Sequence, residues 1–305
     1  MYTKITAVHL YQIPNTTTNK NIGQPGITFI FVRYILRMKS ILYLTDFYYQ
    51  AKGRAYYKED LYITSKLKDH FNILIGHPHQ ANSYLEYADI IIFRNTGSVM
   101  NYEPYFKEFV NNVKKKNLLT FNSFDGKGDQ KGKDYLLYLT KNNYPVIPTV
   151  ENLSELNTLG VSENYMVKMK NGADSIGQEK ISYRDAHNIE LNGKIIQPYI
   201  DFKYEVSFIY LNNQFQYAVY APQKDKRWEL IEYVPSANEI EFADQFIQWN
   251  SLKRGITRVD ACCISDNSLL LVELEDLNPY LSLEVLSEIK RETFIKNWIE
   301  ILANI

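Results

Sequence analysis

A hairpin-like segment near the end of the chain carries the side chains best suited to chemistry. Two apolar, β-prone runs flank residues 265–268, whose Ser-Asp-Asn-Ser sequence is typical of a tight turn. If this turn has an even length and is centred in that sequence, Asp260 lies directly opposite Glu273, and Arg258 lies opposite Glu275. Because side chains alternate between the two faces of a strand, all four then share one face. An odd-length turn would break this register.

Two carboxylates that face each other across a strand pair are about 5 Å apart at Cβ and repel each other. The residues beside Asp260 and Glu273 are apolar, so we expect a positive group between the two acids. Mg²⁺ suits such an all-oxygen site, because it is commonly held by one or two carboxylates together with substrate phosphates. The alternative is a solvated hairpin face on which Arg258 pairs with Glu275.

A second segment has the composition of a phosphate-binding element. The strand-like sequence around Lys168 runs into a loop of small residues, 171–177, which contains Gly172 and Gly177. Such loops let backbone N–H groups approach phosphate oxygens while a lysine supplies positive charge. The segment matches neither the P-loop nor the G-x-G-x-x-G sequence, and an ordinary hairpin turn is the alternative.

The order of strands and helices indicates how these segments are positioned. From Met38 to about residue 122, short apolar strands alternate with stretches of helical spacing, which predicts a parallel sheet with crossover helices. A glycine- and charge-rich loop and a helix follow, and the chain is then rich in strands until two helices close it. We predict strands at 40–45, 71–75, 88–93, 118–121, 166–169, 195–200, 206–211, 216–220, 256–264 and 269–274, and helices at 58–70, 102–115, 134–142, 237–253 and 283–303.

The composition narrows the class of protein. The chain has 305 residues, of which 45% are apolar and 23% charged, as is typical of a soluble globular protein. Its net charge of −1 argues against nucleic acid or an anionic membrane as the main partner. The adjacent Cys262 and Cys263 cannot form a disulfide framework or a metal knuckle, and no run reaches the roughly 18 apolar residues of a membrane span. We therefore expect a cytoplasmic protein.

Residues 1–37 differ from the rest of the chain. They contain basic residues but no acidic one, and Arg33 interrupts their apolar run, which makes them a poor signal peptide. Three interpretations stay open: an upstream extension with Met38 as the real beginning, a structured arm, or an organellar targeting peptide.

Taken in order, the motifs resemble the ATP-grasp superfamily, specifically its small carboxylate–amine ligase-like members related to glutathione synthetase and D-alanine–D-alanine ligase. The sequences that begin at Asn122 (Asn-Ser-Phe-Asp), at Lys133 (Lys-Asp-Tyr-Leu-Leu-Tyr-Leu) and at Pro145 (Pro-Val-Ile-Pro-Thr) resemble the family's entry lysine, helix and V-P-T turn. Lys168 and the loop at 171–177 resemble its second lysine and the flexible loop that covers the phosphates.

Two later motifs extend the resemblance. The sequence 197–205, Gln-Pro-Tyr-Ile-Asp-Phe-Lys-Tyr-Glu, resembles the hinge whose backbone reads adenine, followed by an acid that binds ribose. Arg258-Val-Asp and the sequence Glu-Leu-Glu-Asp-Leu-Asn-Pro at 273–279 resemble the magnesium motif, and the spacing from Asp260 to Glu273 is the usual one of the family. The resemblance covers roughly residues 85–290.

The resemblance implies an α/β (α+β) chain with an ATP-grasp fold and a preceding small parallel-sheet α/β domain. We expect the extension at 1–37 to be followed by the small α/β domain at 38–122. The smaller ATP-grasp subdomain is expected at 123–200, and the larger subdomain, with the magnesium site, at 201–305.

The resemblance also implies roles for single residues. Arg258 would offset the charge that develops on the transferred phosphoryl group, and Arg227 would contact substrate or phosphate. Mg²⁺, or Mn²⁺ in its place, would be held by Asp260, Glu273 and Glu275. The residues expected to bind ATP are Lys133, Lys168, Gly172, Ser175, Gly177, Gln197, Tyr199, Ile200 and Glu205.

Two positions depart from the family's pattern. Glu275 stands where the common motif E-x-N has Asn, a change that affects the charge of the metal site. Met169 follows the second lysine, where Pro is usual, and changes only packing.

The activity implied is an ATP-dependent ligation. A carboxylate attacks the γ-phosphate to form an acyl phosphate, and an amine then displaces phosphate to leave an amide or peptide-like bond. The alternatives are an ATP-grasp kinase that phosphorylates a small molecule, and a non-catalytic nucleotide-binding module that regulates a partner. The expected partners are small-molecule carboxylate and amine substrates, with a homodimer as the default oligomer.

Further substrate contacts are less specific. Arg227 follows a predicted strand, and an exposed basic loop is its alternative role. Arg94 ends an apolar strand and could bind a carboxylate bidentately, or it could form a structural salt bridge. His77 and His79 are interpreted as loop residues, because we find no further ligands for a metal.

Overall fold

The computed structural model describes residues 37–305 except 52–53, 98 and 173–176. Residues Met38–Ile305 form one compact unit, distinct from residues Met1–Arg37. The three interpretations of the N-terminal segment concern residues outside the described ones and stay predictions. Within the described part of the chain, no helix is long and apolar enough to cross a membrane.

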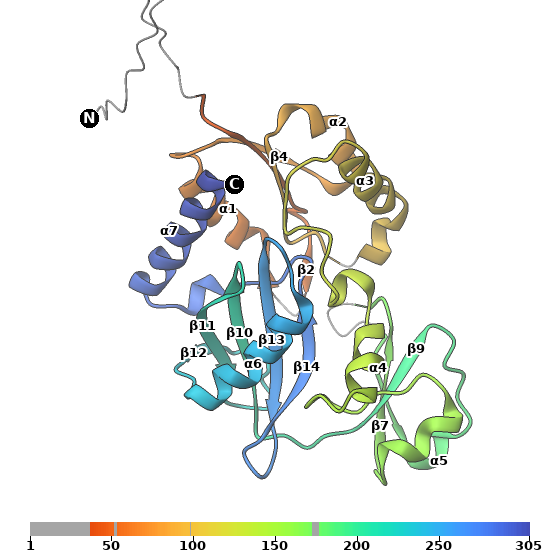
Figure 1. Cartoon of the computed structure of the whole chain (residues 1–305). Coiled ribbons are helices and arrows are strands. Elements are labelled where there is room, and N and C mark those ends of the chain that lie inside the picture. Colours follow the sequence, from red (N-terminus) through yellow and green to blue (C-terminus); the bar gives the residue numbers. More distant parts are fainter. Residues whose placement is uncertain (1–36, 52–53, 98, 173–176) are drawn as a thin grey trace, which may run out of the picture. The chain divides into compact units, whose positions relative to one another are not determined.

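The first sheet of the compact unit, of which Figure 1 labels strand β4, is parallel, with strand order β4-β1-β5-β6. Its central strand β1 is apolar on both faces, as expected where helices cover a sheet from both sides. Ile41 and Tyr43 pack with helix α1, whereas Leu42 and Leu44 pack with helix α3. The elements of this region are β1 (Ser40–Leu44), β2 (Gln50–Ala51), β3 (Arg54–Ala55), α1 (Tyr57–Leu67), β4 (Asn72–Gly76), α2 (Ala81–Tyr84), β5 (Ile90–Phe93), α3 (Glu103–Lys115) and β6 (Thr120–Phe121).

A small antiparallel sheet with strand order β8-β7-β9 follows in the chain. One face of it packs around Tyr165 and Val167, which are buried with Ile196 from β9. The 3-10 helix η4, helix α4 and the 3-10 helix η5 precede this sheet in the chain. The elements are η4 (Asp129–Lys131), α4 (Asp134–Lys141), η5 (Leu153–Leu159), β7 (Asn164–Met169), β8 (Glu179–Ser182), α5 (Tyr183–Ala186) and β9 (Lys194–Pro198).

The largest sheet is antiparallel, with strand order β12-β11-β10-β13-β14. Phe208 and Tyr210 of β10 pack with helices α4 and α6 on one face, and Ile209 and Leu211 pack with helix α7 on the other. Helix α6 begins with a capping box, which satisfies its first free N–H groups. The elements are β10 (Tyr204–Leu211), β11 (Gln214–Ala221), β12 (Ile231–Tyr233), α6 (Ala237–Asn250), β13 (Ile256–Cys263), β14 (Leu269–Glu275), η6 (Leu283–Val285) and α7 (Glu288–Asn304).

Helix α7 connects the largest sheet with the parallel sheet. Its Trp298 is fully buried, and its ring centroid lies 5.9 Å from that of Phe121 in β6. Tyr62 of α1 donates a hydrogen bond of 2.9 Å to Glu292 of α7. The apolar core around α7 therefore contains residues from both ends of the unit 38–305, which holds the parallel sheet close to the strands that carry the candidate site.

Candidate nucleotide and metal site

A cavity of about 1100 Å³ is lined by residues from all three of these sheets or from the loops beside them. Its wall is formed by residues of β7, β9, β10, β13 and β14 and of the loop after β5. Ser175 lies outside the described residues. Of the other residues predicted to form the site, all except Gly177 line this cavity.

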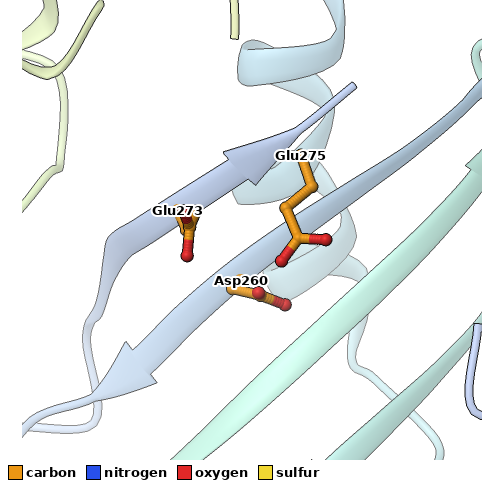
Figure 2. A group of neighbouring side chains, drawn as sticks. All are labelled: Asp260, Glu273 and Glu275. Carbon is orange, nitrogen blue, oxygen red and sulfur yellow. The ribbon is translucent and has the colours of Figure 1, made fainter. Parts of the chain in front are cut away.

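Three carboxylates gather on the hairpin of β13 and β14. Asp260, Glu273 and Glu275 each offer an oxygen atom, and these oxygens lie within 4.8 Å of one another (Figure 2). Asp260 pairs with Glu273 across the two strands, as the sequence predicted. All three side chains are partly buried, so hydration screens their repulsion only in part. We refer to Asp260, Glu273 and Glu275 as the carboxylate cluster.

The predicted pairing is confirmed, but the reasoning about the turn was wrong. Ile264 and Ser268 close a three-residue turn, in which Asn267 has a φ of 69°. Such an odd-length turn alone would place Asp260 out of register with Glu273. The register shifts by one residue between Asp260 and Ala261, because Leu271 pairs with Ala261 and leaves Val272 as an extra residue. This β-bulge restores the pairing beyond it.

Arg258 lies across the carboxylate cluster. Its guanidinium donates to both oxygens of Asp260, at 2.8 to 3.2 Å, and to Glu275 Oε1 at 2.5 Å. A third contact runs from Nη1 to the carbonyl of Tyr280 at 2.8 Å. Burial alone would lower the pKa of Arg258, but Asp260 and Glu275 raise it well above its ordinary value. The predicted cross-strand pair of Arg258 and Glu275 is thus present, together with a second carboxylate.

Lys133 joins the start of α4 to the carboxylate cluster. Its ammonium donates to Glu273 Oε1 at 2.6 Å and to the carbonyl of Gly172 at 2.8 Å. Burial by itself would raise the pKa of Glu273, but the positive charges of Lys133, Lys168 and Arg258 lower it. Glu273 is therefore held as an anion that is available to a metal ion.

Lys168 of β7 differs from Lys133 in its contacts. Its side chain is 9% exposed, and among the described residues it forms no hydrogen bond or ion pair. Burial lowers the pKa of Lys168 to about 8. A buried ammonium without a partner favours the approach of an anion, and the Lys168 side chain lines the cavity.

The predicted phosphate loop is described only at its ends. Gly172 bends back so that its N–H donates to Met169 at 3.2 Å. Gly177 has a φ of 69°, and a Cβ added there would lie 2.8 Å from Met169 Cγ, so glycine is needed at this position. Met169, which stands where the family usually has Pro, thus packs against the far end of the loop.

The predicted adenine hinge lines the cavity from Gln197 to Ile200. The side chain of Gln197 is buried and donates to Thr149 Oγ1 at 2.8 Å, so it stabilises the V-P-T turn. Lys180 Nζ lies 3.7 Å from the ring centroid of Tyr199. These contacts hold the hinge in place and leave backbone groups as its means of recognition.

Glu205 and Arg227, which both line the cavity, form an ion pair. Arg227 Nε donates to Glu205 Oε2 at 2.5 Å. Burial raises the pKa of Glu205, and Arg227 opposes this shift. Arg227 is therefore not simply an exposed loop residue, since it is held beside the residue predicted to bind ribose.

The option that Arg94 binds a substrate carboxylate is not supported. Its side chain is buried, pairs with Glu59 at 2.9 Å and donates to the carbonyl of Pro279, and it does not line the cavity. The structural salt bridge is the observed alternative. His77 and His79 lie in a loop and a 3-10 helix, where His79 stacks on Tyr105 with centroids 4.5 Å apart. Within the described ranges, the only group of acidic, His or Cys side chains suited to a metal is the carboxylate cluster.

The sequence reasoning missed a pair of aspartates that fix the end of β14. The backbone N–H of Asp276 donates to Asp129 at 2.7 Å, and the N–H of Gly128 donates to Asp276 at 2.9 Å. A Cβ on Gly126 would lie 2.0 Å from the Asp276 carboxylate. The closely spaced glycines just before Asp129 were the available signal, since they mark a backbone that another chain segment approaches closely.

Comparison with known proteins agrees with this geometry. No protein-family model matches the sequence, and no curated protein matches it. Among solved structures, D-cycloserine synthetase DcsG aligns with a TM-score of 0.67 and 16% identity, covering 86% of this chain and 99% of that one. D-alanine–D-alanine ligase from Bacillus anthracis, complexed with ATP, aligns with a TM-score of 0.60 and 13% identity, over 84% and 92% of the two chains.

A third similar structure is the ATP-grasp ligase PsnB, complexed with a minimal precursor. It aligns with a TM-score of 0.61 and 11% identity, over 87% of this chain and 99% of that one. At such identities the likeness concerns the fold, and it extends over the parallel sheet, the small antiparallel sheet and the large sheet that carries the carboxylate cluster. The chain therefore has the ATP-grasp fold.

Proposed function

We propose that the protein is an ATP-dependent ligase that activates a carboxylate as an acyl phosphate and joins it to an amine, with release of ADP and phosphate. The main support is that one cavity holds Lys133, Lys168, Arg258 and the carboxylate cluster. The similar structures include a ligase complexed with ATP and another with Mg and ADP.

The nucleotide would bind along the wall formed by the hinge and the two lysines. Backbone groups of residues 197–200 would face the base, and Glu205 would accept from the ribose hydroxyls. Lys168 has no other partner among the described residues, so its ammonium would pair with a phosphate oxygen. Lys133 would add a second charge next to Glu273.

The carboxylate cluster fits a hard divalent cation. Its donors are all carboxylate oxygens, which Mg²⁺ and Mn²⁺ prefer, and they lie close enough together to share one ion. When bound, Mg²⁺ would neutralise phosphate charge. Asp260, Glu273 and Glu275 would hold it, and Lys133 would orient Glu273.

The reaction needs positioning and charge, and no side-chain nucleophile. Arg258 stands beside the cluster and would face the oxygens of the transferred phosphoryl group, where it offsets developing charge. Arg227, held by Glu205, would face the phosphates or the substrate. The free thiols of Cys262 and Cys263 are both buried, which fits the reducing conditions of the cytoplasm.

Thermal unfolding tests the nucleotide site first. A ligand at 100 times its dissociation constant stabilises a protein by about 2.7 kcal/mol, which is worth several degrees for a chain of this size. We expect that rise with Mg-ATP, and a smaller one with Mg-GTP or with ATP and a chelator. No shift at millimolar Mg-ATP would contradict the proposal.

Product analysis then separates the ligase from its alternatives. Amino acids, short peptides and amines are added with Mg-ATP, and ADP and free phosphate are measured. A ligase releases both in equal amounts, a kinase releases ADP alone, and a regulatory module that binds Mg-ATP releases neither.

A further inference from the structure

The carboxylate cluster already holds a cation that belongs to the chain. Asp260 accepts three hydrogen bonds from the guanidinium of Arg258, in which Nε contacts both carboxylate oxygens and Nη2 contacts one. Ser207 of β10 donates a further bond of 2.6 Å to Oδ1. A carboxylate has about four lone-pair sites, so little of Asp260 is left for a metal ion while Arg258 is in place.

Glu275 completes this arrangement. Its Oε1 accepts from Nη2 of Arg258, the same nitrogen that contacts Asp260. The guanidinium therefore bridges two members of the carboxylate cluster, and both of these side chains are 19% exposed. An asparagine at position 275, as in the common motif, would offer no charge to such a bridge. The extra carboxylate thus makes the arginine a stronger occupant of the site.

The remaining guanidinium nitrogen of Arg258, Nη1, is held by a group outside the carboxylate cluster. Nη1 donates to the carbonyl of Tyr280, in the segment that follows β14. Buried Glu59 of helix α1 accepts from the N–H groups of Leu281 and Leu283, each at 3.1 Å, and so anchors that segment to the parallel sheet. When the guanidinium leaves the acids, it can pivot about this fixed carbonyl and remain in the cavity.

We propose that Arg258 is the resident counter-ion of the carboxylate cluster, and that a divalent cation enters by displacing its guanidinium from Asp260 and Glu275. The exchange follows from charge, because a divalent ion replaces a single positive charge among three carboxylates and contacts their oxygens more closely. This inference rests on the metal role proposed above and adds that metal binding releases Arg258. The guanidinium then becomes available to the phosphoryl group only after the metal has bound.

The first test measures Mn²⁺ binding to the nucleotide-free protein by the EPR signal of free Mn²⁺. If Arg258 occupies the site, Arg258→Met should bind Mn²⁺ more tightly by about tenfold to a hundredfold, the range for removing competing hydrogen bonds to charged groups. Arg258→Lys keeps the charge but loses the planar fork that bridges two acids. It should still bind Mn²⁺ several-fold more tightly than the unmodified protein.

The lysine variant separates displacement from simple charge repulsion. If repulsion alone mattered, Arg258→Lys would bind Mn²⁺ as the unmodified protein does, and this result would overturn the proposal. Failure of Arg258→Met to bind Mn²⁺ more tightly would overturn it as well. The matched control is Arg227→Lys, which changes an arginine that lines the same cavity but pairs with Glu205 outside the carboxylate cluster. It should leave Mn²⁺ affinity unchanged.

The second test observes the guanidinium itself in the full chain. The ¹⁵N–¹H signal of Arg258 Nε, assigned by its loss in Arg258→Lys, should shift or exchange faster on titration with Mg²⁺. The signal of Arg94 Nε, which is buried away from the cavity, should stay in place. An unchanged Arg258 signal at saturating Mg²⁺ would show that metal and arginine occupy the site together. Ligase activity is measured in a separate experiment, by the release of ADP. The displacement of Arg258 and the proposed ligase function can therefore fail independently of each other.

Discussion

Two regions of the cavity hold charge in opposite ways. At the hairpin of β13 and β14, the anions Asp260 and Glu275 share Arg258, and Glu273 is paired with Lys133. At β7, the buried ammonium of Lys168 forms no ion pair with any described residue, and its pKa falls to about 8. In the first region, two cations of the chain balance two of the three carboxylate charges before any ligand arrives, whereas Lys168 in the second region remains open to an anion.

This difference indicates what each region contributes. In a buried ion pair the two opposite charges offset each other. Such a pair fixes the geometry of its side chains and adds little attraction for a ligand. A buried unpaired cation destabilises the folded chain, and a phosphate oxygen would relieve that cost on binding. We therefore expect the acidic region to determine position and the Lys168 region to determine affinity for the nucleotide. The predictions below test this contrast, from the largest effect to the smallest.

Glu273→Gln should have the largest effect on activity. The substitution removes a charge from the carboxylate cluster and the partner of Lys133, and it keeps the shape of the side chain. Loss of one such preorganised electrostatic contact typically costs about 100-fold to 1000-fold in turnover. The measurement is release of ADP with saturating Mg-ATP and substrates.

The control for that variant is Glu190→Gln, which removes a charge from an exposed residue in the loop between α5 and β9. It should retain full turnover. If Glu273→Gln also retained it, the metal assignment of the carboxylate cluster would be wrong.

Lys133→Met and Lys168→Met should change stability in opposite directions at pH 7. Lys133→Met leaves the partly buried Glu273 without its hydrogen-bond partner, and an unsatisfied group of this kind costs about 1–3 kcal/mol. Lys168→Met removes a buried charge that has no partner among the described residues, so the free energy of unfolding should rise. Urea unfolding of the three proteins without ligand measures both changes.

The same substitution of Lys168 should affect Mg-ATP affinity in the opposite sense to stability. Lys168→Met should weaken it by about tenfold to a hundredfold, the value of a charged hydrogen bond to phosphate. A Lys168→Met protein that is less stable than the unmodified chain would contradict the contrast between the two regions.

Much of this arrangement could be predicted from the sequence, because it depends on local periodicity. The parallel sheet, the hairpin of β13 and β14 and the lysine-bearing strand β7 all follow from apolar runs and turn residues. The pairing of Asp260 with Glu273 was predicted from a wrong turn length and holds because of the bulge. The short strands β8 and β12 were not predicted. They lie at sheet edges, and of their residues only Ile181 is buried, so they have no apolar run that would mark them.

Contacts between distant segments were beyond the sequence. The pair of Arg258 with Glu275 was visible in the register, but the bond of Arg258 to the Tyr280 carbonyl depends on where the chain turns after β14. The role of Arg94 depends on Glu59, which is 35 residues away and carries no motif of its own. The compensating bulge at Val272 likewise follows from packing across the sheet, since nothing in the local sequence marks it.

The stability difference between Lys168→Met and the unmodified protein should disappear as the pH rises. Lys168 has a folded pKa of about 8, below its ordinary value of 10.5, so the folded chain releases its proton first. Between these two values the unfolded chain binds more protons, and stability of the unmodified protein rises with pH. The advantage of Lys168→Met, on the order of 3 kcal/mol at pH 7, should thus largely close by pH 10. An advantage that persists at pH 10 would mean that burial does not lower the pKa of Lys168 in the folded chain.

Ser207→Ala should have the smallest effect, and it tests whether the acidic region sets geometry. Ser207 donates to Asp260 from the neighbouring strand β10, directly opposite in the register. Its removal costs about 1 kcal/mol of stability, the value of a single hydrogen bond. Because Glu273 and Glu275, the two other acids of the proposed metal site, are unchanged, turnover should fall only a few-fold while the affinity for Mg-ATP stays the same. A large loss of Mg-ATP affinity in Ser207→Ala would show that the carboxylate cluster, and not the Lys168 region, governs nucleotide binding.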